Sequence, residues 1–310
     1  MSQLPILVRR ELWEHRGVFL ILPAIITAVF ISLLLLLLVA ASSNGMDISV
    51  DAEYESGSET REFTIQDSSL MDVFGVQLSQ LAQMPAEVRE ARLNQLFSGV
   101  SVLWFGILWV VIFFYLLGSL YDDRRDRSIL FWKSMPVSDT LTVVSKLAAG
   151  LLLAPLIYLG FVVFAHLAIA IIATIAASGQ DVSMWDTLWV SANFFSRWIW
   201  FLVFFAFTIF WCLPFFGWVL LVSSWAKSAP LAWVIGVPVV LMLLEATLFN
   251  SNFLTGFVKQ HSLSIDFWGH GSAVLGNFRL PEAIELASSL VVGMLFLGLA
   301  VWQRGKADEI

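Results

Sequence analysis

Charged residues are scarce in this sequence: they make up 13% of its 310 residues, while hydrophobic residues make up 59%. A soluble domain of similar length carries about a quarter charged residues and is closer to half apolar. With so few charges, water cannot solvate most of the surface, and lipid must replace it. The composition therefore excludes a soluble catalytic domain and indicates an integral membrane protein.

The sequence also lacks paired cysteines and a nucleotide-binding motif. The single cysteine, Cys212, lies within an apolar run, which excludes a disulfide framework and a cysteine metal site and predicts a small buried hydrophobe. The phosphate-binding pattern G-x-x-x-x-G-K-[ST] is absent, because Gly305-Lys306 lacks the upstream glycine. We expect no catalytic residue, no metal and no bound cofactor in this chain, and no nucleic-acid partner.

Long hydrophobic runs dominate what is present. A membrane-crossing helix needs roughly 20 apolar residues, and six stretches qualify: 18–41, 100–121, 143–177, 198–222, 229–249 and 287–302. The first is too long for the apolar region of a signal peptide. We expect Pro155 to kink or redirect the third stretch, and Pro214 and Pro238 to kink the fourth and fifth.

The basic residues predict which side each loop faces, because cytoplasmic loops are enriched in Lys and Arg. With the N-terminus inside, the inner segments carry eleven basic residues and the longer outer segments carry six. Both termini are therefore expected in the cytoplasm. The inner set is Arg9, Arg10, Arg16, Arg124, Arg125, Arg127, Lys133, Lys146, Lys227, Arg304 and Lys306, and the outer set is Arg61, Arg89, Arg92, Arg197, Lys259 and Arg279.

Two outer segments are predicted to carry structure. Segment 42–99 alternates apolar and polar residues around Ser56-Gly57-Ser58, which indicates a hairpin, and then has a helix pattern opened by Pro85. We expect a small extracytoplasmic α/β insertion there; its acidic excess is a solvated face or, as the alternative, a cation-attracting vestibule. Segment 250–286 predicts re-entrant or interfacial helices. Its His261 and His270, with Asp266 between them, give only weak spacing for a metal site and are expected in water-facing loops.

The resulting fold class is an all-α polytopic membrane protein with six spans. An amphipathic N-terminal helix at 1–17 precedes them, the α/β insertion follows the first span, and the tail 303–310 is cytoplasmic.

The inner segment 122–142 has an unusual composition for a loop. A charged stretch, Asp122 to Arg127, leads into a short helix pattern carrying Ile129, Leu130 and Trp132. Met135-Pro136 ends that pattern, because a residue before proline disfavours the helical region. Ser138 or Asp139 is placed to cap the next helix. Apolar residues next to both signs of charge favour docking onto another protein, whereas a plain basic loop would need no apolar residues.

This segment resembles the cytosolic coupling segment of type-2 permeases of the ATP-binding-cassette exporter family. The matching residues are Asp123 or Asp126, Ser128, Leu130, Pro136, Val137, Ser138 and Lys146. There are two departures: Arg127 stands where glycine is common, and Asp139 stands where a basic residue is common. The order of N-terminal amphipathic segment, six spans and enlarged first outer loop is similar too.

The resemblance implies a permease subunit without its own ATPase activity, located in the cytoplasmic (inner) membrane of a bacterium. A separate ATP-binding-cassette ATPase would bind the ATP and magnesium, and a second permease copy or a related chain would complete the translocation path within the lipid bilayer. The implied ATPase-docking residues are Asp123, Arg124, Asp126, Arg127, Ser128, Leu130, Met135, Pro136, Val137 and Ser138.

Ionisable residues within the spans are candidates for the translocation path, because a charge there costs about 2.5–3.5 kcal/mol on insertion scales. Glu245 and His166 are the candidates, with an interhelical or interfacial hydrogen bond as the alternative role for each. Two other functions stay open. One is a membrane enzyme subunit, for which the spans offer only His166, Glu245 and Cys212 on different helices. The other is a membrane sensor or immunity protein that binds a ligand through its acidic outer domain.

Overall fold

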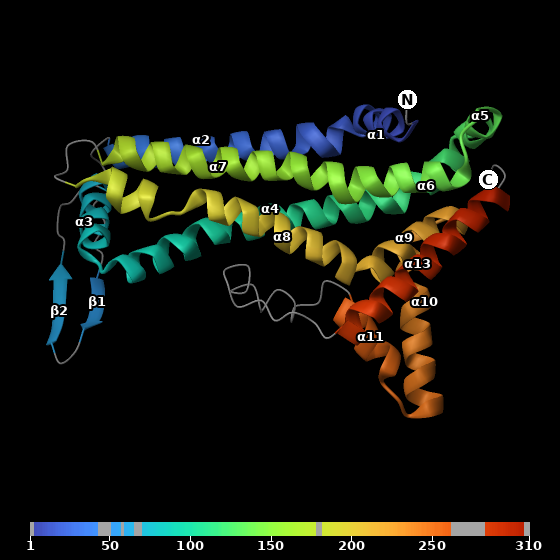
Figure 1. Cartoon of the computed structure of the whole chain (residues 1–310). Coiled ribbons are helices and arrows are strands. Elements are labelled where there is room, and N and C mark those ends of the chain that lie inside the picture. Colours follow the sequence, from blue (N-terminus) through green and yellow to red (C-terminus); the bar gives the residue numbers. More distant parts are fainter. Residues whose placement is uncertain are drawn as a thin grey trace. The chain divides into compact units, whose positions relative to one another are not determined.

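A computed structural model describes residues 3–42, 51–56, 59–64, 70–177, 182–261 and 283–306, with side chains described for 3–40, 77–177, 182–261 and 283–306. The described chain is almost entirely helical (Figure 1). Its elements are α1 (Gln3–Glu14), η1 (Gly17–Ile21), α2 (Leu22–Ser42), β1 (Asp51–Ser56), β2 (Glu59–Thr64), α3 (Leu70–Gln83), α4 (Ala86–Arg125), α5 (Ser128–Ser134), α6 (Asp139–Ala148), η2 (Ala149–Leu153), α7 (Ala154–Ala176), η3 (Trp185–Val190), α8 (Phe194–Trp211), α9 (Leu213–Trp225), α10 (Pro230–Leu244), η4 (Glu245–Phe249), α11 (Phe253–His261) and α13 (Ala283–Lys306), where η marks π-helix.

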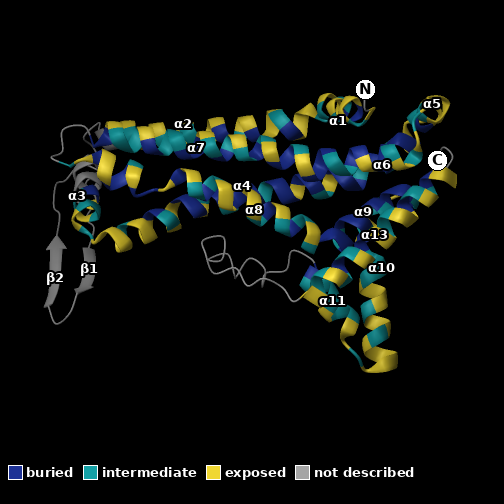
Figure 2. Ribbon diagram, viewed as in Figure 1, coloured by how far each residue is buried: buried dark blue, intermediate teal, exposed yellow. Residues whose placement is uncertain are grey.

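Six helical segments are long and apolar enough to cross a membrane, as the sequence predicts. Together with the helical content, they make the chain an all-α polytopic membrane protein. The segments are Gly17–Ala40, Ala86–Arg125, Asp139–Ala176, Trp185–Trp211, Pro230–Phe249 and Ala283–Lys306. Many of their apolar side chains are exposed to the surroundings (Figure 2), which suits a lipid environment.

The fourth span differs from the predicted stretch 198–222. The helical segment begins earlier, at Trp185, and α8 ends at Trp211. Cys212 leaves the helical conformation, and the shorter helix α9 starts at Leu213 with Pro214 in its first turn. Because Pro214 has no N–H and its ring crowds the preceding turn, one continuous apolar run becomes two helices.

Prolines also coincide with π-helical turns. The turn η1 lies just before Pro23, and η2 lies just before Pro155. A proline ring clashes with the carbonyl of the residue four positions earlier, and a widened turn relieves that clash. Pro155 therefore alters the third span locally, and the helix continues through α7.

Segment 42–99 contains the two strands and α3 and then enters α4. The strands pair antiparallel, with Asp51 opposite Thr64 and Ser56 opposite Glu59. The carbonyl of Pro85 accepts the first hydrogen bond of α4, from the Arg89 N–H, so this helix starts where the proline predicts. The extracytoplasmic location of the segment and its unity as an insertion stay predictions. Residues 43–50, 57–58 and 65–69 lie outside the described part.

The chain forms two compact units. The first contains Met1–Leu22, Ser101–Gly160 and Trp198–Ile310; the second contains Pro23–Val100 and Phe161–Arg197. In the first unit, α13 packs chiefly against α9 (Figure 1). These helices approach closely at two glycines, since a Cβ on Gly293 would come within 2.5 Å of Leu213 Cγ and one on Gly217 within 2.9 Å of the Gly293 carbonyl oxygen. Small residues at such crossings are usual between membrane helices.

The second unit has a polar centre around Arg197, which is only 8% exposed. Its guanidinium donates to Asn94 O and Ser98 Oγ, both at 3.0 Å, and to Ala192 O at 2.8 Å. These bonds join the start of α8 to α4 and to the chain just before α8. A buried cation inside a membrane helix is costly unless its N–H groups are hydrogen-bonded in this way.

Candidate functional site

The segment predicted to dock an ATPase forms α5 and its flanks, here called the α5 loop (residues 126–138). Arg127, just before the helix, has φ 59°, in the left-handed region. Ser128 Oγ donates to Asp123 O at 3.2 Å, which ties the start of α5 back to α4. Ser138 caps α6 as predicted, because its side chain accepts from the Leu141 N–H at 3.2 Å. Met135 is extended before Pro136, so α5 ends as the sequence indicates.

One side chain of α5 points inward and its neighbours point outward. Ile129 is fully buried, whereas Leu130 is 52% exposed, Phe131 57% and Met135 41%. The burial of Ile129 holds α5 in place, and the exposed three form an apolar surface. The other predicted docking residues of the loop are exposed or half-buried: Asp126, Arg127, Ser128, Pro136, Val137 and Ser138.

Asp123 and Arg124 require a correction, because both are only 5% exposed and are not part of a docking surface. Arg124 Nη2 donates to Ser223 O at 3.0 Å and to Ala226 O at 2.6 Å, at the end of α9. Ser223 Oγ accepts in turn from the N–H groups of Leu120 and Tyr121. Arg124 thus fastens α4 to α9, and sequence reasoning gave it the wrong partner.

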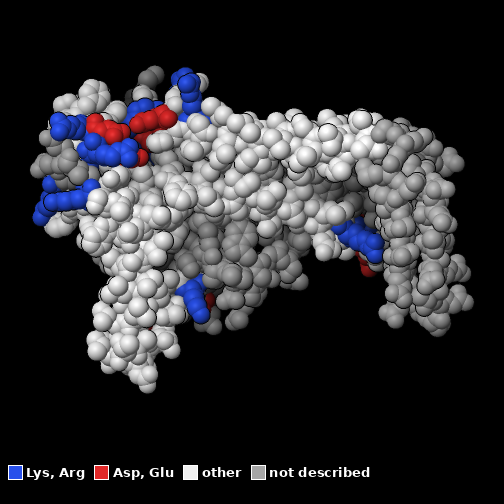
Figure 3. All heavy atoms as spheres, turned by 180° about the vertical axis from the view of Figure 1, so that it is seen from behind, with Lys and Arg blue, Asp and Glu red and all other residues white. Residues whose placement is uncertain are grey.

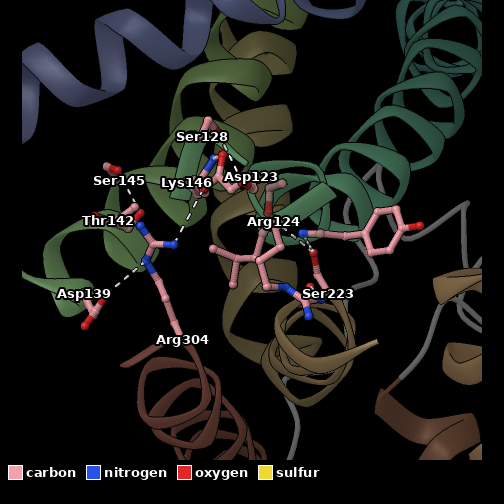
Figure 4. A network of polar contacts seen from close by, with 12 residues as sticks. Asp123, Arg124, Ser128, Asp139, Thr142, Ser145, Lys146, Ser223 and Arg304 are labelled. Carbon is pink, nitrogen blue, oxygen red and sulfur yellow. Dashed lines mark hydrogen bonds and ion pairs between the residues drawn. The ribbon is translucent and has the colours of Figure 1, made fainter. Parts of the chain in front are cut away.

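Asp123 belongs to a group of charges, here called the anchor cluster: Glu11, Asp123, Asp139, Lys146 and Arg304, of which all but the half-buried Asp139 are buried. Lys146 Nζ lies 3.3 Å from Glu11 Oε1 and 3.3 Å from Asp123 Oδ1. The three side chains are 1%, 0% and 5% exposed, in that order. This pairing connects α1, α4 and α6 across long stretches of sequence. Figure 4 shows Lys146 of α6 beside Asp123 of α4.

Arg304, near the end of α13, contacts both sides of the α5 loop. Its Nη1 lies 3.7 Å from Asp123 Oδ2, and its Nε lies 3.3 Å from Asp139 Oδ1. Asp123 precedes the α5 loop and Asp139 follows it, so one guanidinium, 3% exposed, forms ion pairs on both sides of the loop (Figure 4). The loop is therefore fixed to α13 at its base and exposes an apolar surface above it.

Neighbouring cations and a hydrogen bond keep the buried Glu11 of the anchor cluster charged. Burial alone would raise the pKa of Glu11, but Lys146, Arg10 and the hydrogen bond from Tyr115 outweigh burial and lower its pKa below the ordinary 4.5. Tyr115 donates to Glu11 Oε2 at 2.9 Å. Burial also lowers the pKa of His15 below its ordinary 6.5, against the opposing effect of Glu11. At pH 7 Glu11 is therefore ionised and His15 is neutral.

The amphipathic helix α1 joins this arrangement through two contacts. Glu11 enters the cluster, and the Arg10 guanidinium lies 3.7 Å from the centre of the Trp132 ring on α5, a cation–π geometry. On the first unit's face in Figure 3, charged side chains gather where α1, α5 and the end of α13 lie, while the neighbouring surface is white. Charges are thus concentrated where these elements meet.

The two candidates for the translocation path have local partners. His166 is fully buried, its Nε2 donates to Phe97 O at 3.0 Å, and its ring packs against Phe97 and Phe194. Glu245 accepts from Ser251 Oγ at 2.6 Å and from the Leu254 N–H at 2.9 Å, and so caps the start of α11. His166 belongs to the second unit and Glu245 to the first. A role of either residue in transport stays a prediction.

Within the described residues, no group of three or more His, Cys, Asp or Glu side chains is placed to hold a metal ion. His261 is not in a water-facing loop, because it ends α11 and is 3% exposed. Asp266 and His270 lie outside the described residues.

Sequence reasoning missed Glu11, Asp139 and Arg304 as members of one cluster. One signal was available: Glu11 stands four residues after Leu7, on the same helical face, and these two are the buried residues of α1. An acidic residue on the apolar face of an amphipathic helix requires a buried cation. Nothing in the sequence indicates that the cation is Lys146.

The comparisons with known proteins identify no relative. No family model, no curated protein and no solved structure matches the chain.

Proposed function

We propose that this chain is the membrane-spanning permease subunit of an ATP-driven exporter, coupled to a separate ATP-binding-cassette ATPase through the α5 loop. The observation that carries the proposal is the construction of this loop. Its apolar residues Leu130, Phe131 and Met135 face outward, while Arg304 forms ion pairs on both sides of the loop. An exposed apolar surface with a charged rim suits a protein partner, and a base fixed to α13 suits a part that transmits force.

The mechanism is a two-state exchange. ATP binding closes the ATPase pair, the α5 loop moves with it, and the anchor cluster transmits the displacement to α1, α4, α6 and α13. The spans then change between two packings with different access to the two sides. Such an exchange transports cargo because ATP and cargo bind the two packings with different affinity.

The remaining parts of the proposal follow from the same family plan. The permease works as a dimer with a second copy or a related chain, in the inner membrane of a bacterium, with both termini in the cytoplasm. The segment 42–99 is its extracytoplasmic insertion. The ATPase subunit supplies ATP and magnesium.

The test is co-purification with the ATP-binding-cassette ATPase encoded beside the gene. The double variant Leu130→Asp, Phe131→Asp places charge on the docking surface and is expected to lower ATPase retention about tenfold or more, as at an interface hot spot. Thr140→Asp is the matched control: Thr140 is exposed and lies in the first turn of α6, where an acidic residue is tolerated. The control is expected to retain the ATPase like the wild type.

Failure of the wild-type chain to retain any ATPase, across several detergents, would reject the proposal. Equal loss in the double variant and in Thr140→Asp would show that added charge, and not the apolar surface, is responsible. In either case the acidic segment 42–99 becomes the place to search for a ligand, as the sensor or immunity function requires.

A further inference from the structure

A recessed cavity of about 490 Å³ opens within the first unit. Its walls come from α4, α9, α10, α11 and α13, represented by Phe113, Trp218, Pro238, Phe257 and Phe296. Among its sixteen lining residues, His261 is the only ionisable one. The volume lies within the range of roughly 300–1,000 Å³ that small-molecule sites occupy.

The wall between α9 and α10 is fixed by a hydrogen bond to a carbonyl that a proline leaves without its helical donor. Pro238 lies inside α10 and has no N–H for the carbonyl of Val234, four residues earlier. The Trp218 indole of α9 supplies the missing donor, because its Nε1 donates to Val234 O at 3.0 Å. In a membrane an unsatisfied carbonyl is costly, so this bond holds the two helices at their separation and keeps the cavity from closing.

The wall formed by α11 is fixed at both ends. Leu254, Phe257, Val258 and His261 share one face of this helix and all line the cavity. Glu245 caps the beginning of α11 through the Leu254 N–H. At its end, the Trp211 indole donates to Gln260 O at 2.6 Å, and the His261 ring stacks on Trp211 and Phe257.

The polar atoms of His261 do not make the site hydrophilic. Its Nδ1 donates to Phe257 O at 3.0 Å, since a carbonyl can only accept. Its Nε2 is buried and has no hydrogen-bond partner among the described residues. Water in the cavity would lack the two to four polar partners that it needs.

The occupant must therefore be apolar. Much of the lining comes from α10, in the fifth candidate span, and a span of this kind is surrounded by hydrocarbon in a bilayer. An empty space of this size would leave its lining atoms without van der Waals contacts on one side. A helix of a second copy, about 10 Å wide, would cover the opening without filling the recess, whereas a flexible chain enters it.

We infer that this cavity is a binding site for one hydrocarbon chain of a membrane lipid. The bound chain completes the packing between α9, α10 and α11, and the site does not depend on an ATPase partner.

Native mass spectrometry of the full-length chain, released from detergent micelles after purification from its membrane, tests the site. The wild type is expected to retain roughly one phospholipid per chain, as a single site of this size requires. Val237→Trp fills the cavity from α10, because Val237 lines it. Val240→Trp is the matched control, with the same substitution three residues later at a position that is 54% exposed and outside the lining.

Val237→Trp is expected to lower the lipid-bound fraction at least about fivefold, while Val240→Trp retains it. Equal lipid retention in both variants would overturn the inference. Loss of a dimer mass in Val237→Trp, with lipid retention unchanged, would overturn it in favour of a second copy of the chain. If Val237→Trp does not yield a folded protein, Val258→Phe fills the same cavity from α11 and is held to the same outcomes.

Discussion

One buried carboxylate, Glu11, contributes to the attachment of the N-terminal helix to the rest of the first unit. Glu11 is fully buried, and Lys146, its cation, is 1% exposed. Replacing Glu11 by Gln leaves Lys146 with Asp123 alone, so we expect the free energy of unfolding to fall by about 3 kcal/mol. Glu14→Gln is the control on the same helix, because Glu14 is 50% exposed and its pair with Arg10 is worth less than about 1 kcal/mol. Thermal or denaturant unfolding in detergent measures both variants.

The same comparison has a defined pH dependence. The pKa of Glu11 is lower in the folded chain than its ordinary 4.5, because Lys146, Arg10 and Tyr115 together outweigh burial. Folding therefore favours the ionised form, and its contribution to stability is complete above pH 4.5 and is lost as the pH falls through the folded pKa. The stability difference between wild type and Glu11→Gln should be constant near pH 7 and shrink below pH 4.5. A constant difference down to pH 3 would contradict the assignment.

Arg127 occupies a backbone position that suits glycine. Its φ of 59° is unfavourable for a residue with a Cβ. We expect Arg127→Gly to be more stable than Arg127→Ala by about 1 kcal/mol, because the variants lose the same side chain and differ only in the Cβ. Melting temperatures of the two variants measure the difference. A more stable alanine variant would show that the turn does not need the left-handed conformation.

At the scale of the helices, the sequence predicts the spans well and their interruptions less well. Hydrophobic runs overlap all six candidate membrane segments, although the fourth segment begins and ends earlier than its run, since a run of about 20 apolar residues has few alternatives. The break at Cys212 is harder to predict. A proline in a span can bend a helix, end it, or be absorbed by a π-turn, as before Pro155. Which of these happens depends on neighbours that satisfy the freed carbonyls.

The α5 loop likewise has features that the local sequence predicts and one that it does not. Its boundaries follow from local chemistry: Pro136 ends the helix and Ser138 caps the next one. The inward turn of Asp123 does not follow from local chemistry, because its partners Lys146 and Arg304 lie far along the sequence. A charged residue in an inner loop is expected in water unless a buried counter-charge is known.

At the break between α8 and α9, a side chain of α13 satisfies the carbonyl that Pro214 leaves without a donor. Pro214 removes the N–H that the carbonyl of Phe210 would accept, and Ser289 Oγ donates there at 2.7 Å and lies 2.8 Å from Trp211 O. Ser289→Ala should cost about 1 kcal/mol in the wild type and less in a Pro214→Ala background, where the new N–H replaces the hydroxyl. Unfolding of the four proteins in a double-mutant cycle measures this coupling. Equal costs of Ser289→Ala in both backgrounds would remove the link to Pro214.

At the scale of the whole molecule, the proposed orientation predicts a labelling pattern. The helix α4 has 40 residues, about 60 Å at 1.5 Å per residue, which is about twice a hydrocarbon core of about 30 Å, and it carries charged residues in its first and last turns, so we expect both ends to extend beyond the core. Glu87, in the first turn of α4, and Ser134, the last residue of α5, which follows α4, are exposed. A membrane-impermeant maleimide added to intact cells should label Glu87→Cys and not Ser134→Cys.

The native chain supplies the background for this experiment. Cys212 is its only cysteine and is fully buried, so the wild type should remain unlabelled. Opening the membranes should allow Ser134→Cys to react as well. The reverse pattern in intact cells would invert the orientation and place the α5 loop out of reach of a cytoplasmic ATPase.

Binding and coupling should separate at Arg304. This side chain is 3% exposed and does not belong to the docking surface, yet it contacts Asp123 before α5 and Asp139 after it. Arg304→Gln should therefore retain the ATPase but lower its turnover in the complex several-fold, because the loop base is no longer held to α13. Lys306→Gln is the matched control on the same helix end, where Lys306 is exposed and lies over the Trp302 ring.

The measurement is ATPase retention and ATP turnover of each complex, side by side with Leu130→Asp, Phe131→Asp. A docking surface on a fixed base requires two results. The double variant should lose the ATPase, and Arg304→Gln should retain the ATPase but turn over ATP slowly. Arg304→Gln also leaves Asp123 and Asp139 with one cation fewer, so its melting temperature must be measured at the same time. Wild-type turnover in a folded Arg304→Gln complex would show that the anchor cluster only stabilises the fold. Motion of the α5 loop would then have to reach the spans through α4 and α6 alone.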